Sequence, residues 1–229
     1  EYDPEREERE VLNLLSYNID ALILTGKQHT ERMVQYVRAS GIPVAELMDI
    51  TEHCLDMQVG IDNEKAAWDM TQAFLEAGKR AVAFFGSMDD PRDVSRYRGV
   101  ERALSEQGLQ PYHVVPKAIS SLALGRQLFL QTMRDRPDIN AIFCTNDDLA
   151  VGALLECQSQ QIPVPQQVAI AGFHGLEIGR ARLQKIASVI TPRYDMGSVA
   201  ADMLIKRLGG KETLDRVNLG YQIYYGDTL

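Results

Sequence analysis

The fold of this chain is decided by the stretch AIFCTNDDLAVGA, residues 141–153. It begins with an apolar run typical of a buried strand, becomes polar, and continues with the spacing of a helix. A second stretch, VAIAGFHG at residues 168–175, repeats the change from an apolar run to small and polar residues. Open α/β sheets bind small ligands at the carboxyl ends of their strands, so both stretches predict binding groups at that edge.

Strand and helix patterns alternate along the rest of the chain. Short apolar runs that end in turn residues predict strands at 21–26, 42–48, 81–86, 141–145, 168–172 and, on an edge, 217–225. Apolar residues at helical spacing predict helices at 5–15, 31–39, 63–77, 94–107, 124–134, 149–160 and 198–208. The clearest boundaries fall at 57–60 and 188–192. Such alternation predicts an α/β protein in which helices cover both faces of a parallel sheet.

Composition narrows the class of protein. The chain has 229 residues, of which 45% are hydrophobic and 24% are charged, as in ordinary globular proteins. No apolar run approaches the roughly 18 residues that span a bilayer. The highly charged start, residues 1–10, is not that of a signal peptide. We therefore expect a cytoplasmic protein.

The net charge and the positions of the cysteines argue against a nucleic-acid-binding surface, a zinc site and a disulfide framework. A nucleic-acid-binding surface needs a basic patch, but this chain has a net charge of −8 and no strong Lys/Arg cluster. We therefore do not expect it to bind DNA by itself. Cys54, Cys144 and Cys157 are widely spaced and the four histidines are scattered, which predicts no zinc site and no disulfide framework. The phosphate-loop, dinucleotide and nucleophile-elbow motifs are also absent from the sequence, so we expect no enzyme, metal or cofactor.

Five blocks occur in the order and spacing of one known family. Residues 141–153 and 168–175 are similar to its "ND.xA.GA … GFDD" signature. Residues 59–83, 96–100 and 162–168 are similar to its "V..DN … L...GH.rIa", "R..G(F/W)" and "G..VP.DV" blocks. Over nearly its whole length the chain therefore resembles the effector-binding domain of the lactose-repressor (LacI/GalR) family.

The resemblance implies a periplasmic-binding-protein type I fold. Two doubly wound parallel-sheet lobes are joined by hinge strands, with the effector between them. In that layout the amino-terminal lobe comprises residues 1–58 and 190–216. The carboxy-terminal lobe comprises residues 59–189 and 217–229. The helix-turn-helix DNA-binding domain, and the first strand, helix and strand of the amino-terminal lobe, are expected to lie outside this chain.

The resemblance also implies which side chains contact the effector. Arg98 matches an arginine that reaches effector hydroxyls; the alternative is a solvated helix arginine. Asn146 matches an asparagine that binds a sugar hydroxyl, and a helix cap is an equal alternative. Thr25 aligns with a polar effector contact, and Ser120 aligns with a position where some relatives stack an aromatic ring.

His174 is the most informative departure from the family pattern, because His174-Gly175 replace the usual pair of aspartates. Aspartate accepts hydrogen bonds from neutral sugars, whereas histidine can donate and can carry positive charge. Arg193 aligns where relatives often place an apolar or aromatic residue. Residues 172–179 also resemble the gluconate-responsive members of the family in enteric bacteria. We therefore predict a sugar acid, gluconate, as the effector; the alternative for His174 is a solvated loop histidine.

The sequence thus predicts the effector-sensing and dimerisation domain of a transcriptional repressor. It is expected to act as a homodimer and to reach operator DNA through the domain that lies outside this chain. One alternative is a periplasmic sugar-binding protein of a transport system, which shares the fold and acts as a monomer. Another is a doubly wound enzyme such as a sugar-phosphate transferase, which would convert its ligand instead of returning it unchanged.

Overall fold

A computed structural model describes residues 3–26, 28–87 and 90–229, which form two compact units. The amino-terminal unit runs to Asp62 and includes Pro192–Gly220. The carboxy-terminal unit comprises the chain from Asn63 to Thr191, apart from a short segment around Pro91, and Tyr221–Leu229. The chain therefore changes unit after residues 62, 191 and 220, whereas the sequence places these changes after 58, 189 and 216.

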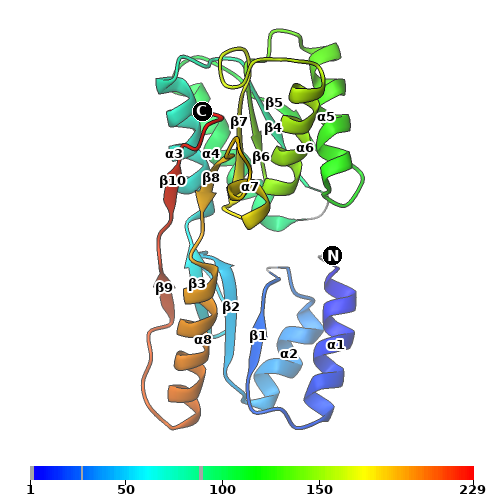
Figure 1. Cartoon of the computed structure of the whole chain (residues 1–229). Helices are drawn as coiled ribbons and strands as arrows, with labels where there is room; N and C mark the ends of the chain where they lie inside the picture. The colour runs from blue at the N-terminus through cyan, green and yellow to red at the C-terminus, as the bar shows by residue number, and fades with distance from the viewer. Residues whose placement is uncertain (1–2, 27, 88–89) are drawn as a thin grey trace. The chain divides into compact units, whose positions relative to one another are not determined.

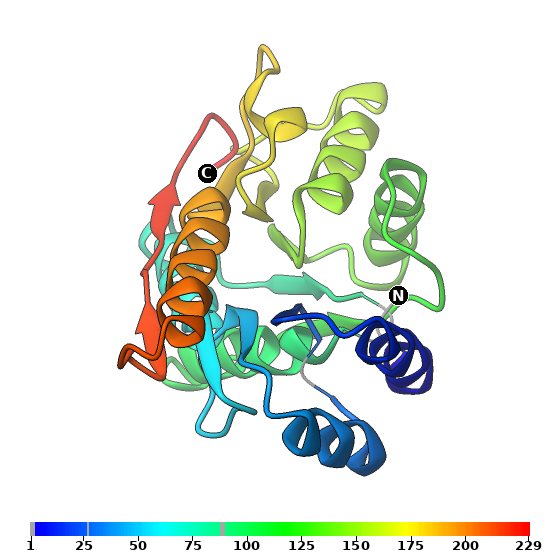
Figure 2. The same ribbon diagram turned by 90° about the horizontal axis from the view of Figure 1, so that it is seen from below.

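The amino-terminal unit contains a four-stranded parallel sheet in the order β1-β2-β3-β9. Its strands are β1 (Leu22–Leu24), β2 (Val44–Asp49), β3 (Met57–Ile61) and β9 (Arg216–Asn218). Its helices are α1 (Pro4–Ser16), α2 (Glu31–Ser40) and α8 (Arg193–Leu208). Helices α1 and α2 pack together and α8 packs on β2 and β3; Figure 2 shows α8 apart from the α1–α2 pair.

Local chemistry sets the ends of these helices. The Asp3 carboxylate accepts hydrogen bonds from two backbone N–H groups in the first turn of α1. The Thr30 hydroxyl caps α2 in the same way, and Gly41 ends α2 in a left-handed conformation. Apolar side chains from both helices then pack against the strands, as in the cluster of Val11, Leu22, Leu24, Met33, Val37 and Val44.

The carboxy-terminal unit contains a six-stranded sheet in the order β10-β8-β7-β6-β4-β5, parallel except for β10 (Figure 1). Its strands are β4 (Val82–Phe85), β5 (Tyr112–Val114), β6 (Ala141–Cys144), β7 (Ala169–His174), β8 (Ala187–Ile190) and β10 (Gln222–Tyr224). Its helices are α3 (Asn63–Glu76), α4 (Pro91–Ser105), α5 (Leu122–Asp135), α6 (Asp147–Ser159) and α7 (Glu177–Arg180).

This strand order places a topological switch point in the carboxy-terminal sheet. From β4 the chain adds β5 on one side, then returns to add β6 on the other side. A crevice forms at the carboxyl ends of two strands whose connections leave in opposite directions, and ligands bind there. The ends of β4 and β6 are therefore where the topology predicts a binding site.

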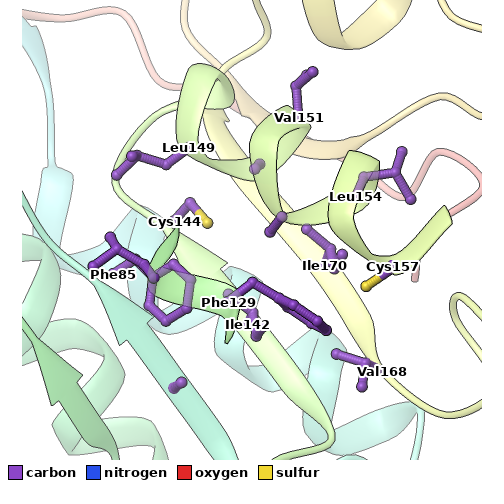
Figure 3. Packing of buried hydrophobic residues seen from close by; sticks show 14 of the residues in the cluster. Phe85, Phe129, Ile142, Cys144, Leu149, Val151, Leu154, Cys157, Val168 and Ile170 are labelled. Carbon is purple, nitrogen blue, oxygen red and sulfur yellow. The ribbon is translucent and has the colours of Figure 1, made fainter. Parts of the chain in front are cut away.

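Apolar residues from the strands and from α5 and α6 fill the core beside this switch point. Figure 3 shows part of the cluster, with Phe85, Phe129 and Ile170 reaching it from β4, α5 and β7. Close contact between α5 and α6 depends on two glycines, because a Cβ on Gly152 would lie 2.9 Å from the Cα of Gly125. No helix in the described ranges is long and apolar enough to cross a bilayer.

The structure corrects the predicted strand at 217–225. Two strands, β9 and β10, occupy this region, and they belong to different sheets. Gly220 lies between them at a φ of +68°, a conformation that breaks an extended strand. The segments at 57–60 and 188–192, which the sequence indicated only as boundaries, overlap the buried strands β3 and β8.

Candidate functional site

A cluster of polar side chains lies at the carboxyl ends of β6 and β7, and Arg96 is at its centre. This arginine on α4 is 1% exposed. Its Nη1 donates to the backbone oxygen and to Oγ1 of Thr145, both at 2.9 Å, and its Nε donates to Asn63 Oδ1 at 3.0 Å. The guanidinium also lies 4.0 Å from the ring centroid of Phe173, within cation–π distance. Arg96 is thus fixed beside the strand ends.

Asp93, one turn earlier on α4, provides the negative charge of this cluster. Its carboxylate accepts hydrogen bonds from the Thr145 hydroxyl and from the backbone N–H of Ser87, which follows β4. Its Oδ1 lies 3.8 Å from Arg96 Nη1. A second arginine on the same helix, Arg92, is also buried, and burial together with the charge of Arg96 lowers the pKa of Arg92 to about 10. Arg92 and Arg96 are therefore two buried guanidinium groups on the same helix as Asp93.

His174 completes the cluster at the end of β7. Its Nε2 is 3.5 Å from Arg96 Nη2, its Nδ1 is 3.4 Å from Thr191 Oγ1, and its ring meets Phe173 edge-on. A guanidinium nitrogen can only donate, so a hydrogen bond from Arg96 requires Nε2 to accept and places the ring proton on Nδ1. The backbone of His174 has a φ of +93°, which is rare for any residue other than glycine. Such backbone outliers concentrate at ligand-binding sites.

The cluster can therefore bind a polar, preferably anionic, ligand. Fixed guanidinium donors and an imidazole converge on a strand edge, and the fold supplies a crevice at the same edge. Guanidinium groups suit carboxylates because their donors form a planar fork. Within the described part of the chain, no group of three or more His, Cys, Asp or Glu side chains has the arrangement of a metal site.

Comparison with known proteins identifies the family. A profile described as "Periplasmic binding protein-like domain" matches residues 71–229. The HTH-type transcriptional regulator IdnR of Escherichia coli K12 is 50% identical over 230 residues, covering 100% of this chain and 69% of IdnR. A LacI-family regulator structure from Silicibacter pomeroyi has a TM-score of 0.94 at 34% identity, over 99% of this chain and 70% of that one. The chain belongs to the LacI family of transcriptional regulators.

Further relatives support the same family and the periplasmic-binding-protein type I fold. The HTH-type transcriptional regulator GntR of Escherichia coli K12 is 43% identical over 229 residues, covering 100% of this chain and 69% of GntR. The structure of the transcription regulator GntR from Chromobacterium violaceum has a TM-score of 0.96 at 31% identity, over 99% of this chain and 84% of that one. LacI-family regulators bind small-molecule effectors and operator DNA and act as dimers.

Arg96 and Arg98 lie on different sides of α4, one buried and the other exposed. Arg98, the residue proposed from the sequence, lies on the exposed side of α4, whereas Arg96 contacts His174. Gly99 explains the difference, because a Cβ on Gly99 would lie 2.9 Å from the backbone nitrogen of Trp68 on α3. Residues three apart share a helix face, so Gly99 turns Arg96 inward. In the family's "R..G" block the arginine likewise stands three residues before the glycine, so this spacing indicates Arg96 in the sequence itself.

The other predicted residues occupy different places in this LacI-family chain. Asn146 caps α6, and its Oδ1 accepts the N–H of Leu149 at 3.1 Å. Ser120, before α5, has a buried hydroxyl that finds no hydrogen-bond partner among the described residues. Thr25 follows β1 and Arg193 begins α8; both are exposed and both belong to the amino-terminal unit. The cluster around Arg96 thus brings together only His174 of the six predicted residues.

A second buried charged group lies in the amino-terminal unit. His29 follows β1, and its Nδ1 is 2.6 Å from Glu7 Oε2 while its Nε2 is 3.3 Å from Glu46 Oε1. Burial alone would lower the pKa of His29, but hydrogen bonds and charge from Glu46 and Glu7 outweigh it and raise this pKa to about 9. Glu46 Oε2 also accepts the N–H of Leu55 at 2.6 Å. His29 is therefore a protonated link between α1 and β2.

Proposed function

We propose that this chain is the effector-sensing and dimerising part of a LacI-type repressor, and that its effector is a sugar acid, with gluconate the best candidate. The observation that carries this proposal is the contact between His174 and the buried Arg96 at the carboxyl ends of β6 and β7. An aspartate at position 174, as in the family pattern, would pair with Arg96 and leave less of its charge for a ligand. With histidine there, no carboxylate at position 174 neutralises the Arg96 guanidinium, and its positive charge favours an incoming carboxylate.

Simple energetics favour an acid over a neutral sugar. A charge-assisted hydrogen bond contributes about 1.5–3 kcal/mol net, roughly twice a neutral one. A carboxylate 4 Å from an aspartate would be repelled by about 4 kcal/mol at an effective dielectric of 20. Replacing that aspartate with His174 therefore removes a penalty that only an anion would experience. The open-chain hydroxyls of gluconate are suited to the polar groups that surround Arg96.

Four predicted contacts remain part of the proposal. Asn146 and Ser120 belong to the same unit as Arg96, and Thr25 and Arg193 belong to the other unit. Among them Ser120 has the strongest physical support, because a buried hydroxyl without a protein partner gains a hydrogen bond when a ligand supplies one. Alanine substitution at each position, followed by titration with gluconate, decides which of them touch the ligand.

Regulation follows from differential affinity. An effector shifts a protein between two conformations only by the difference in its affinity for them. We propose that gluconate binding shifts the dimer, in the cytoplasm, between states of different operator affinity, and that the ligand leaves unchanged. A periplasmic sugar-binding protein is the alternative; it is less favoured because the matched relatives at 43–50% identity are transcriptional regulators.

Thermal unfolding with a ligand panel tests the proposal. A ligand at 100 times its Kd stabilises the folded state by about 2.7 kcal/mol. We expect gluconate and related aldonates to raise the melting temperature by several degrees, and galactose and ribose to leave it unchanged. The variant His174→Asp should lose the response to gluconate. Stabilisation by a neutral sugar with no response to any aldonate would contradict the sugar-acid proposal.

A further inference from the structure

The backbone that follows His174 is hydrogen-bonded to a buried carboxylate, that of Asp147, directly and through Ser188. Asp147, the first residue of α6, is 1% exposed. One of its oxygens accepts a hydrogen bond from the Ser188 hydroxyl at 2.7 Å, and the other accepts the backbone N–H of Leu176. The Ser188 hydroxyl in turn accepts the backbone N–H of Gly175 at 3.1 Å. Asp147 and Ser188 thus bind the two backbone N–H groups that follow His174.

The backbone at His174 and Gly175 has an unfavourable conformation that the surrounding hydrogen bonds must stabilise. His174 has a φ of +93° and Gly175 has a φ of +64°, so two successive residues lie in the left-handed region. For a side chain such as histidine this conformation costs of order 1–3 kcal/mol and persists only where its surroundings impose it. The two N–H groups that follow can be held in place by the Asp147–Ser188 pair.

The surroundings of Asp147 are adapted to this role. Gly172 of β7 leaves room for the carboxylate, because a Cβ there would overlap Asp147 Oδ1. As the first residue of α6, Asp147 also lies where a helix dipole favours negative charge. Capping of α6 is performed by Asn146, which accepts the N–H of Leu149. Asp147 is therefore not needed as the cap of α6.

We propose that Asp147 is a positioning residue, which acts through Ser188 and through its own hydrogen bond to the Leu176 N–H. It sets the orientation of the His174 imidazole and thereby the affinity of the site for its anionic ligand. This inference rests on the proposed function for the identity of the ligand, but not for the contact itself. In metal sites, groups that orient a ligating histidine without touching the metal change affinity or activity by about 10–100-fold. The same logic applies here through backbone hydrogen bonds.

The first test needs no ligand. The 229-residue chain contains four histidines, whose ring resonances can be followed by NMR and assigned for His174 by its loss in His174→Ala. We expect Asp147→Ala and Ser188→Ala to shift the His174 ring signals. The matched control Asp148→Ala removes the same charge from the same helix turn, at a half-buried position, and should leave them in place. Unmoved His174 signals in both Asp147→Ala and Ser188→Ala would overturn the proposal.

The second test measures gluconate affinity in a double-mutant cycle. We expect Asp147→Ala to weaken binding roughly tenfold or more, and Asp148→Ala to change it by less than about twofold. In a His174→Ala background, adding Asp147→Ala should have less than about a twofold effect, because the histidine that it positions is gone. An equal loss in both backgrounds would show that Asp147 acts by another route.

The two tests separate this proposal from the proposed function. If Asp147→Ala does not fold, Ser188→Ala removes only the Gly175 branch of the contact and is expected to give the same shift and a smaller loss of affinity. If the unmodified chain does not bind gluconate, the sugar-acid proposal fails, and the His174 ring signals still decide whether Asp147 positions that residue.

Discussion

Arg96 and Arg98 offer a direct test of which arginine belongs to the site. Arg96→Met removes the hydrogen bonds to Asn63 Oδ1 and to two oxygens of Thr145, together with the contact to His174 Nε2. It also leaves Asp93 beside a neutral side chain. Breaking a buried charge pair from one side costs about 3–5 kcal/mol. For a domain of 150–250 residues each kcal/mol lowers the melting temperature by about 2–4 °C, so we expect a drop of roughly 6–20 °C.

Arg98→Met is the matched control, since the same substitution is made two residues later on the exposed side of α4. Surface substitutions change stability by about 0.5 kcal/mol or less, so the melting temperature should move by less than about 2 °C. Circular dichroism during heating measures both variants, and gluconate should stabilise Arg98→Met but not Arg96→Met. The reasoning is refuted if the two variants unfold at the same temperature, or if Arg98→Met alone loses the response to gluconate.

Three further predictions concern other parts of the chain. His29 has a pKa raised to about 9, above its unfolded value near 6.5; its contribution to stability is therefore complete below pH 6.5 and is lost as the pH rises towards 9 and above. Melting temperatures measured from pH 6 to 10 should fall less in His29→Gln than in the unmodified chain, and parallel curves would contradict the assignment. Gly152→Ala should destabilise by about 1–3 kcal/mol, because the new Cβ would overlap α5. Gly197→Ala, on α8 with no atom beyond its chain neighbours and the adjoining helix backbone within 4 Å of the new Cβ, should instead stabilise the chain by about 0.4–1 kcal/mol. Urea titration measures the stability of both glycine variants, and a loss of stability in Gly197→Ala would contradict the prediction.

The strand–turn–helix at 141–153 could be predicted from the sequence because its local signals agree. The apolar run, the polar turn and the helical spacing all indicate the same structure, and β6 and α6 lie there. Strand β3 lacked that agreement, because it contains Gln58 and Gly60 in a five-residue segment. Gln58 is buried nonetheless, and its side chain bonds the backbone of Thr51, a tertiary contact that no local pattern reveals.

The residues of the candidate site also differ in how far the sequence could reveal them. His174 could be found from the sequence because it departs from a recognisable pattern at a strand end. Arg96 and Arg98 both fit the charge expected of a site. The three-residue spacing from Arg96 to Gly99 favours Arg96 in the sequence, and the packing of Gly99 against α3 gives the physical reason. The role inferred for Asp147 was out of reach, because its partners Leu176 and Ser188 are 29 and 41 residues away along the chain.

The central claim, that this LacI-family chain senses a sugar acid through Arg96 and His174, is tested most directly by calorimetric titration of the 229-residue chain with gluconate and with galactose. We predict saturable binding of gluconate that persists in Arg98→Met and disappears in Arg96→Met, together with no binding of galactose. Binding of galactose without binding of gluconate, or gluconate binding that survives in Arg96→Met, would contradict the account.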